Sequence, residues 1–431
     1  MSITELESRL EKIYADIELH KKGLENLEKS KSLVKGQLNA IRDPVSRLPL
    51  EIATEIFLRC LPAHPEPAAD EVPMILLRVC NAWTTIALSV PSLWTTIHLN
   101  FPCSEHLCQI VEKWIQRTKT LPLSISLSGP PEEGVADTIL LHSKQLKRLE
   151  ICVIPDPDPD ASFDNSYHQF LADLKPRPLP SLQVFRLDDA WQEAFEWDAI
   201  HRFLSFAPNL THCIIENILM SEYMNPVDQL VLSSMRRLIF SDSSSLPEMY
   251  GSWRTSDELL KFVTAPQLEV LTLPMYDITS EMLLSFLQRS SPQLRELALQ
   301  FDYGINDDIL NPDSTHLAHL PECLLLIPTL ARLEMWIRDN SVLENLATAL
   351  NSFDTLPNLR DLVLRWILTP PSESMWDTLL SILYTRRGSQ LRTVRIDFKS
   401  GTPLSIPSTF GSAVRELSKD DMEVSTGWFE Y

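Results

Sequence analysis

The amino-acid sequence predicts an α/β repeat protein that begins with a long helix and a small helical module. Three observations lead to this fold class. An apolar template typical of a short strand recurs along most of the 431-residue chain. A heptad pattern occupies the amino terminus, and an apolar stretch, LLRVCNAWTTIALSVPSLWTTIHL, separates the two regions. The expected boundaries are residues 1–43 for the helix, 44–94 for the module and 95–431 for the repeats.

Residues 1–43 carry the heptad pattern of a coiled coil. Steps of three and four through residues 3–41 give twelve positions, ten of them apolar and the other two His20 and Lys31. A seam sustained over more than five heptads predicts a helix that pairs with a second copy as a parallel homodimer. A single amphipathic helix lying on the rest of the protein and a frayed segment are the alternatives. Pro44 is expected to end the helix.

The segment that follows, PVSRLPLEIATEIFLRCLP, predicts a short amphipathic helix. Ser46 is the expected N-cap residue, and Pro49 suits the first helical turn. A proline-rich and acidic gap comes next. A second, continuous amphipathic helix is then expected, ended by Pro91, with an apolar face formed by Leu76, Val79, Cys80, Trp83, Ile86 and Ala87.

The order of these elements resembles an F-box. The residues that carry the resemblance are Leu48-Pro49, Glu51-Ile52, Ile56-Phe57, Leu61-Pro62, Val79-Cys80, Trp83, Pro91 and Leu93-Trp94. The segment is similar to the F-box proteins expanded in mushroom-forming fungi, which often begin with a short coiled coil. It departs from many F-boxes in a longer loop at residues 63–73, and in Asn81-Ala82, where basic residues often stand.

This resemblance implies a helical module that docks on a Skp-type adaptor, through which a cullin-based ubiquitin ligase receives its substrates. Two or three short helices cannot bury much apolar surface by themselves. The apolar side chains that remain exposed therefore need a partner protein to cover them. Internal packing is the alternative for Trp83 and Trp94. The residues expected to form or support the adaptor-binding surface are Leu48, Pro49, Ile52, Ile56, Phe57, Val79 and Trp83.

The rest of the chain repeats the template L-x-x-L-x-L at intervals of about 30 residues. Its last apolar positions are Leu99, Leu127, Ile151, Leu187, Ile215, Phe240, Leu273, Leu299, Met335, Leu364 and Ile396. Period and template resemble leucine-rich repeats, in which stacked units build a continuous core. Because the asparagine common in regular repeats is mostly missing, we expect an irregular solenoid. A stacked α/β barrel is the alternative.

Alternation along the strands predicts which side chains face solvent in the last three repeats. Leu333, Met335, Ile337, Leu362, Leu364, Trp366, Val394, Ile396 and Phe398 are expected to point inward. The outward residues include a basic and aromatic patch, which is the candidate target-binding surface: Trp336, Arg338, Arg365, Arg395 and Lys399. Such a patch suits an acidic or phosphorylated segment of a target protein. The alternative is that these cations only pair with neighbouring acids.

The amino-acid composition limits the classes of partner and of binding site that the protein is expected to have. The chain has 38 basic and 58 acidic residues, a net charge of −20, which disfavours nucleic acid and acidic membranes as partners. No apolar run is long enough to span a membrane. Seven cysteines without a CxxC pair and a charged first segment predict a cytoplasmic or nuclear protein. Two groups only superficially resemble cation sites. The acidic run at residues 156–160 lacks the glycine and the closing glutamate of a calcium loop, and His316 with His319 and Cys323 lacks a fourth zinc ligand.

No catalytic motif, cofactor site or metal site is predicted, and the protein is not expected to be an enzyme. The leading hypothesis is a substrate-recognition subunit of a Skp-cullin-F-box type ubiquitin ligase, with the repeats binding a target protein of unknown identity. A ligase-independent interaction scaffold is the alternative. A hydrolase or transferase built on repeats is a third, more remote hypothesis.

Overall fold

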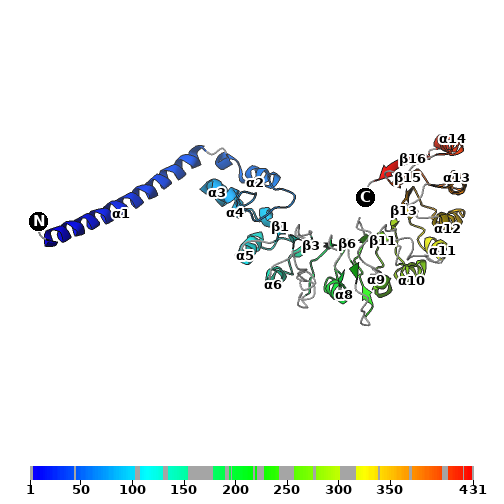
Figure 1. Ribbon diagram of the computed structural model, residues 1–431, viewed down its shortest axis with the longest axis horizontal. Helices are drawn as coiled ribbons and strands as arrows, with labels where there is room; N and C mark the ends of the chain where they lie inside the picture. Colours follow the sequence, from blue (N-terminus) through cyan, green and yellow to red (C-terminus); the bar gives the residue numbers. More distant parts are fainter. Residues whose placement is uncertain are drawn as a thin grey trace. The chain divides into compact units, whose positions relative to one another are not determined.

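The computed structural model has a long amino-terminal helix followed by a mostly parallel sheet with helices (Figure 1). The chain divides into two compact units, Met1–His98 with Gln109–Leu121, and Leu99–Cys108 with Pro122–Tyr431. The structure describes residues 3–42, 45–101, 107–129, 134–153, 178–189, 194–195, 197–216, 219–220, 228–241, 257–274, 278–300, 317–337, 340–367, 371–399, 406–420 and 422–429.

The first unit begins with α1 (Ile3–Arg42), one uninterrupted helix of 40 residues. The predicted helix is therefore confirmed, and it stops two residues before Pro44. The apolar seam residues whose surroundings are described are exposed, from 43% for Leu38 to 76% for Ile3. Pairing with a second copy stays a prediction.

Short helices make up the rest of this unit. They are η1 (Val45–Arg47), α2 (Leu50–Arg59), α3 (Leu76–Val79), α4 (Asn81–Ser89), η2 (Pro91–Trp94) and α5 (Leu107–Thr118). The expectation that Ser46 is the N-cap residue of the first amphipathic helix, α2, is wrong. Ser46 lies within η1, and the N-cap of α2 is Pro49, whose extended backbone supplies no side-chain cap.

The expectation of one continuous helix across Leu76–Ala87 is also wrong. Cys80 has an extended backbone (φ −161°, ψ 168°) and separates α3 from α4. The carbonyl of Cys80 accepts the first backbone hydrogen bond of α4, from the amide of Thr84 at 3.0 Å. Extended geometry is usual for an N-cap residue, so Cys80 ends one helix and starts the next.

Twelve strands form one sheet, in the order β1-β2-β3-β4-β6-β9-β11-β12-β13-β14-β15-β16; all of them lie in the second unit except the first residues of β1. The strands are β1 (Thr96–Asn100), β2 (Leu123–Ser128), β3 (Leu146–Val153), β4 (Val184–Asp189), β6 (His212–Glu216), β9 (Arg237–Ser241), β11 (Val270–Pro274), β12 (Glu296–Gln300), β13 (Arg332–Ile337), β14 (Asp361–Trp366), β15 (Thr393–Lys399) and β16 (Glu423–Phe429). All eleven predicted strands are present, and β16 was not anticipated.

Two short pairs stand outside this sheet. They are β5 (Ala194–Phe195) with β7 (Leu219–Met220), and β8 (Leu230–Val231) with β10 (Val263–Thr264). Among the described residues, no pairing joins the two ends of the large sheet, so the sheet is open rather than closed into a barrel.

Backbone hydrogen bonds join each repeat to the preceding one both along the strand and at the residues just before the strand. The amide of Thr211 donates to the carbonyl of Gln183, and the amide of Arg236 donates to the carbonyl of Thr211, both at 2.9 Å. The equivalent hydrogen bond, from the residue before one strand to the residue before the preceding strand, recurs along the sheet as far as the amide of Arg392, which donates to the carbonyl of Arg360. These bonds satisfy backbone groups that would otherwise be buried without a partner, so each repeat is held in register by the one before it.

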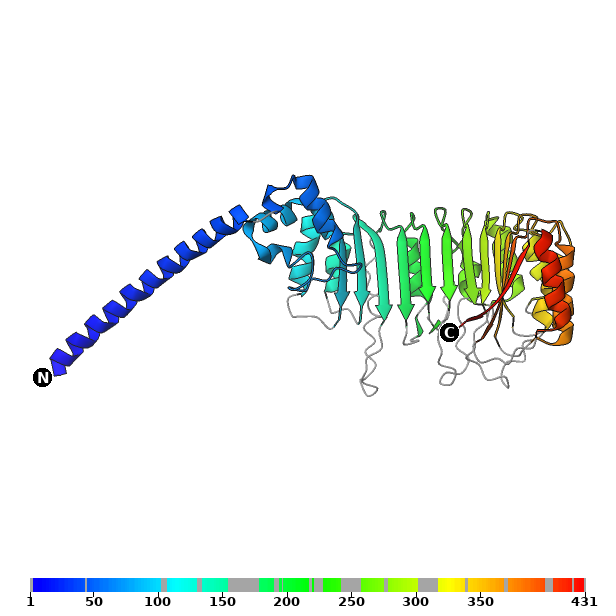
Figure 2. The same ribbon diagram turned by 90° about the horizontal axis from the view of Figure 1, so that it is seen from above.

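Helices cover one face of the sheet, and the strands follow an arc with the helices on its outer side (Figures 1 and 2). The helices of this unit are α6 (Val135–Leu141), α8 (Trp197–Ser205), α9 (Asp257–Phe262), α10 (Ser280–Ser290), α11 (Leu320–Leu325), α12 (Asn340–Leu350), α13 (Glu373–Thr385) and α14 (Ser408–Leu417), followed by η3 (Ser418–Asp420). We call the opposite face of the sheet the open face.

The core lies between the sheet and its helices. The last apolar residue of every predicted template, from Leu99 to Ile396, is buried, with at most 4% of its surface exposed. Alternation along the strands requires this burial. The nine inward positions expected in β13, β14 and β15 are all buried as well. Burying one such side chain contributes about 1.5–3 kcal/mol, so the stacked strands supply the main stabilising term of this unit.

Candidate functional site

The helical module leaves several large apolar side chains exposed. We call these residues the exposed apolar set; each is between 38% and 52% exposed, and they are Leu48, Leu50, Ile52, Ile56, Ile75, Val79 and Leu88. Pro49 is exposed beside them. Four of the seven residues expected to contact an adaptor, Leu48, Ile52, Ile56 and Val79, belong to this set.

The other two predicted residues, Phe57 and Trp83, lie underneath. Phe57 is buried, and its ring centre is 5.1 Å from that of Trp83, which is half-buried. The indole Nε1 of Trp83 is buried without a hydrogen-bond partner among the described residues. This aromatic pair joins α2 to α4, so it supports the exposed apolar set from below rather than forming part of it.

A second aromatic pair fixes the end of the module. The indole of Trp94 is fully buried and donates from Nε1 to the carbonyl of Ala87 at 3.0 Å. Trp114 of α5 packs edge-on against it at 5.0 Å and donates to the carbonyl of Trp94 at 2.8 Å. The guanidinium of Arg117 lies 4.2 Å above the Trp94 ring. Trp94 is therefore a core residue with no exposed binding surface.

The loop at residues 63–73 is tied to its surroundings. The amide of His98 donates to the carbonyl of Pro65 at 2.7 Å, and Arg78 Nη1 donates to the carbonyl of Ala69 at 3.0 Å. Pro65 and Pro73 are buried. The loop thus forms part of the support for α3 and β1.

The open face of the sheet carries a second group of chemically distinctive residues. Four strands repeat the pattern arginine, apolar residue, acid, in which the two charged side chains lie on the open face. The pattern occurs as Arg148-Leu149-Glu150, Arg186-Leu187-Asp188, Arg332-Leu333-Glu334 and Arg395-Ile396-Asp397. Within each of the four, the arginine forms an ion pair with the acid two residues on. This pattern was not among the features predicted from the sequence.

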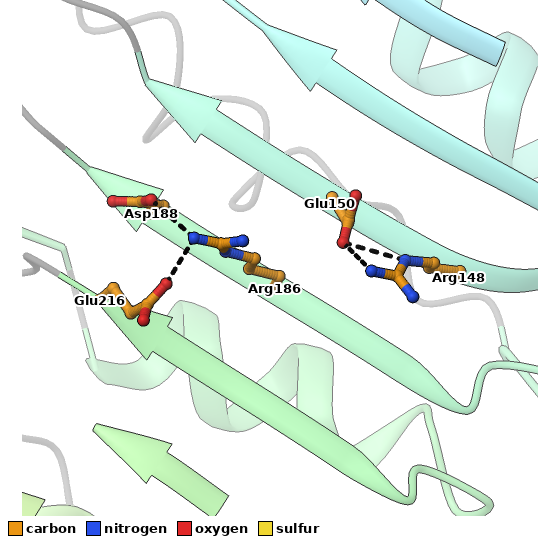
Figure 3. Close-up of polar contacts among 5 residues, drawn as sticks. All are labelled: Arg148, Glu150, Arg186, Asp188 and Glu216. Atoms are coloured by element: carbon orange, nitrogen blue, oxygen red, sulfur yellow. Dashed lines mark hydrogen bonds and ion pairs between the residues drawn. The ribbon is translucent and has the colours of Figure 1, made fainter. Parts of the chain in front are cut away.

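The first two occurrences form a net acidic cluster at β3, β4 and β6 (Figure 3). Arg148 Nε donates to Glu150 Oε1 at 2.9 Å. Arg186 Nη2 lies 3.2 Å from Asp188 Oδ2 and 2.7 Å from Glu216 Oε2. The pKa of Arg186 is raised even though partial burial opposes the charge, because Glu216 and Asp188 stabilise it. Two arginines here face three carboxylates.

The last two occurrences contain the predicted target-binding patch. The expectation that Trp336 is exposed is wrong, because its side chain is only 6% exposed. Trp336 faces the open side, but its Nε1 donates to Glu334 Oε1 at 3.2 Å and its ring lies 6.2 Å from that of Phe429. The unanticipated strand β16 supplies Phe429, which explains why the alternation alone gave the wrong exposure.

The predicted cations of this patch differ in their surroundings. Arg365 Nε lies 3.1 Å from Glu334 Oε1, and Arg395 Nε donates to Asp397 Oδ1 at 2.8 Å. These two arginines therefore pair with neighbouring acids, as the alternative interpretation holds. Lys399 is half-buried on β15 and also has an interaction partner, whereas Arg338 lies outside the described residues.

Cysteine and histidine residues do not gather into a metal site in the described part of the chain. His316 and residues 156–160 lie outside it. Cys323 is buried and its Sγ donates to the carbonyl of Ser280 at 3.3 Å; burial raises its pKa to about 12. A thiol held in this state is a poor metal ligand, since metals bind the thiolate.

Comparison with known proteins adds no family assignment. No protein-family model matches the chain, and no curated protein matches its sequence. Within the described residues, every helix is too short or too polar to cross a membrane. Two surfaces are therefore the candidate functional sites: the exposed apolar set on the short helices and the paired charges on the open face.

Proposed function

We propose that this protein is the substrate-recognition subunit of a Skp-cullin-F-box type ubiquitin ligase. The helical module docks on the adaptor, and the repeats, of an irregular leucine-rich type, bind a target protein through the open face. The contribution to ubiquitin transfer is proximity, because the chemistry belongs to other subunits. The protein acts in the cytoplasm or the nucleus, where such ligases work.

The observation that carries this proposal is the exposed apolar set. Its members Ile52, Ile56 and Val79 stand at positions that resemble the F-box pattern. They are exposed although the neighbouring Ala53 and Phe57 are buried. Seven large apolar side chains left in water on one small module favour a partner that covers them. A protein adaptor with an apolar binding surface fits this requirement.

Capture of a purified Skp adaptor tests the proposal. The double variants Leu48→Ala with Pro49→Ala, and Ile52→Ala with Ile56→Ala, should lose the adaptor while keeping the wild-type melting temperature. Leu121→Ala is the matched control, because Leu121 is an exposed leucine of the same unit outside the motif. Undiminished capture by both double variants would refute adaptor docking. Wild-type protein that brings down no cullin from cells would favour the scaffold alternative.

The exposed seam of α1 supports a further partner, a second copy of this chain. Lys31 and His20 interrupt the apolar seam and set its register in a parallel pair. Deleting residues 2–41 should convert a dimer into a monomer, measured by light scattering. Intact protein that is already monomeric at micromolar concentration would exclude the homodimer.

A further inference from the structure

Arg365 is held in an unusual way for an arginine on an exposed sheet face. The carbon at the centre of its guanidinium lies 5.8 Å from the ring centre of Trp336 and 5.5 Å from that of Phe429. Both separations lie within the range of cation–π attraction. The two ring centres are themselves 6.2 Å apart, so the guanidinium lies beside the aromatic pair, and its Nε is also ion-paired with Glu334. Its side chain is nevertheless 29% exposed.

Arg395 occupies a neighbouring position with the same mode of contact. Strand register pairs it with Val363, two residues from Arg365 on the adjacent strand. Its Nε is bound to the fully buried Asp397, and its side chain is 55% exposed. Gly427 follows in register, and a Cβ there would lie 2.6 Å from Asp397 Oδ1. The glycine is therefore required for Asp397 to remain where it holds Arg395.

The terminal nitrogens distinguish these two arginines from Arg148, Arg186 and Arg386. Arg148 contacts Glu150 through both Nε and Nη2, and Arg186 contacts Asp188 and Glu216 through Nη2 (Figure 3). Arg386 donates from Nε and Nη2 to three backbone carbonyls. In contrast, Arg365 and Arg395 contact acids through Nε alone within the described residues, which leaves both Nη groups without a protein partner.

We infer that Arg365 and Arg395 form an oxyanion-binding site that takes a phosphate or carboxylate group of an extended partner segment. The end of a guanidinium presents two parallel N–H groups, which match two oxygens of such an anion. Orientation by fixed neighbours lowers the entropy that binding must offset. Trp336 and Phe429 act as positioning residues for Arg365.

The two carboxylates that contact these arginines, those of Glu334 and Asp397, are already ion-paired. The strand register places Glu296, Asp361 and Glu423 on the open face as well, in line with Arg332. Recognition of an anion therefore depends on the Nη donors of Arg365 and Arg395 and not on a net positive charge of this region. The inference rests on the proposed role of the open face in binding a target, but not on adaptor docking.

Oriented peptide libraries test the site directly. Purified full-length protein is incubated with three degenerate libraries that carry phosphoserine, aspartate or serine at one fixed position. Wild-type protein should retain the phosphoserine or the aspartate library over the serine library. Preference for phosphoserine alone identifies a phosphate, and equal retention of both acidic libraries identifies a carboxylate. Equal retention of all three libraries would overturn the inference.

Charge-conserving variants show whether the two arginines are responsible. Arg365→Lys and Arg395→Lys keep the positive charge but lose the paired N–H groups, so each should weaken retention about tenfold or more. Arg148→Lys, on the same face, is the matched control and should leave retention unchanged. Wild-type retention by both variants would place the anion elsewhere. Adaptor capture by the same variants should be normal, which separates failure of this site from failure of the proposed function.

Discussion

The same apolar residue types meet opposite surroundings in the two units. On the strands of the second unit, leucine and isoleucine at the inward positions are fully or almost fully buried between sheet and helices. On α2 and α3 of the first unit, Ile52 and Val79 remain about half exposed, at 49% and 48%. A chain able to bury its apolar residues so completely in one region does not expose them in the other for lack of apolar partners. The difference supports the proposal that another molecule covers the exposed apolar set.

Polar groups repeat this contrast within the second unit. Arg386 is buried, and its donors go to the carbonyls of Leu350, Ser352 and Thr355 at 2.7–2.8 Å. Burial also lowers its pKa. Arg365 is 29% exposed, and its ion pair with Glu334 is through Nε. The donors of Arg386 are therefore used within the fold, whereas the terminal nitrogens of Arg365 have no such partner among the described residues.

The largest expected effect separates the two kinds of apolar residue. Leu364→Ala removes a fully buried side chain from β14 and should lower the free energy of unfolding by about 2–5 kcal/mol. Ile52→Ala removes an exposed one and should change it by no more than about 0.5 kcal/mol. Urea denaturation followed by circular dichroism measures both. Comparable losses in the two variants would mean that Ile52 belongs to a core, and the contrast between the units would fail.

Replacing the buried arginine should have the next largest effect. Arg386→Met preserves much of the side-chain volume but leaves three backbone carbonyls without donors, at a cost of about 2–3 kcal/mol in unfolding free energy. Arg387→Met is the control, because Arg387 is more exposed and pairs with Glu416 at the surface. That change should cost less than about 1 kcal/mol. If Arg386→Met leaves the free energy of unfolding unchanged, the three carbonyls must find other hydrogen-bond donors.

Two glycines provide a smaller and oppositely signed comparison. Gly427→Ala places a Cβ 2.6 Å from Asp397 Oδ1, and the resulting displacement should destabilise the protein by about 1–3 kcal/mol. Gly411 lies inside α14, and a Cβ there meets no atom within 4 Å. Gly411→Ala should therefore stabilise the protein by up to about 1 kcal/mol, since alanine favours helix. Thermal unfolding gives both signs, and a stabilising Gly427→Ala would show that Asp397 moves freely.

Much of the fold could be predicted because its signals are local and periodic. The eleven strands follow from the repeated template, and the inward residues follow from alternation. The break at Cys80 could not be predicted, because no proline or glycine marks it and the N-cap geometry comes from the backbone alone. Strand β16 has the weaker pattern EVSTGWF, with few core-facing apolar residues, as expected for a strand at the edge of the sheet.

The candidate site shows the same limit. Leu48, Ile52, Ile56 and Val79 are exposed, as a binding surface requires, and their contact with an adaptor stays a prediction. The burial of Trp336 depends on Phe429, which lies 93 positions later in the numbering and on an unpredicted strand. The arginine, apolar residue, acid pattern was visible in the sequence. Which of those arginines keep free donors depends on cross-strand neighbours such as Glu334 and Glu216, which only the register reveals.

The smallest expected effect concerns cysteine reactivity, which reports burial without perturbing the fold. Cys60 is exposed on the first unit, whereas Cys213 is fully buried on β6, and burial raises the pKa of Cys213 to about 12. At pH 8 only about one in 10⁴ of such thiols is ionised, and the thiolate is the reactive form. N-ethylmaleimide should therefore label Cys60 within minutes and leave Cys213 unmodified in native protein, measured by mass spectrometry of digested samples. In urea both should react at similar rates, which is the internal control. Rapid labelling of native Cys213 would mean that β6 opens to solvent, and that the second unit is less closed than its buried leucines indicate.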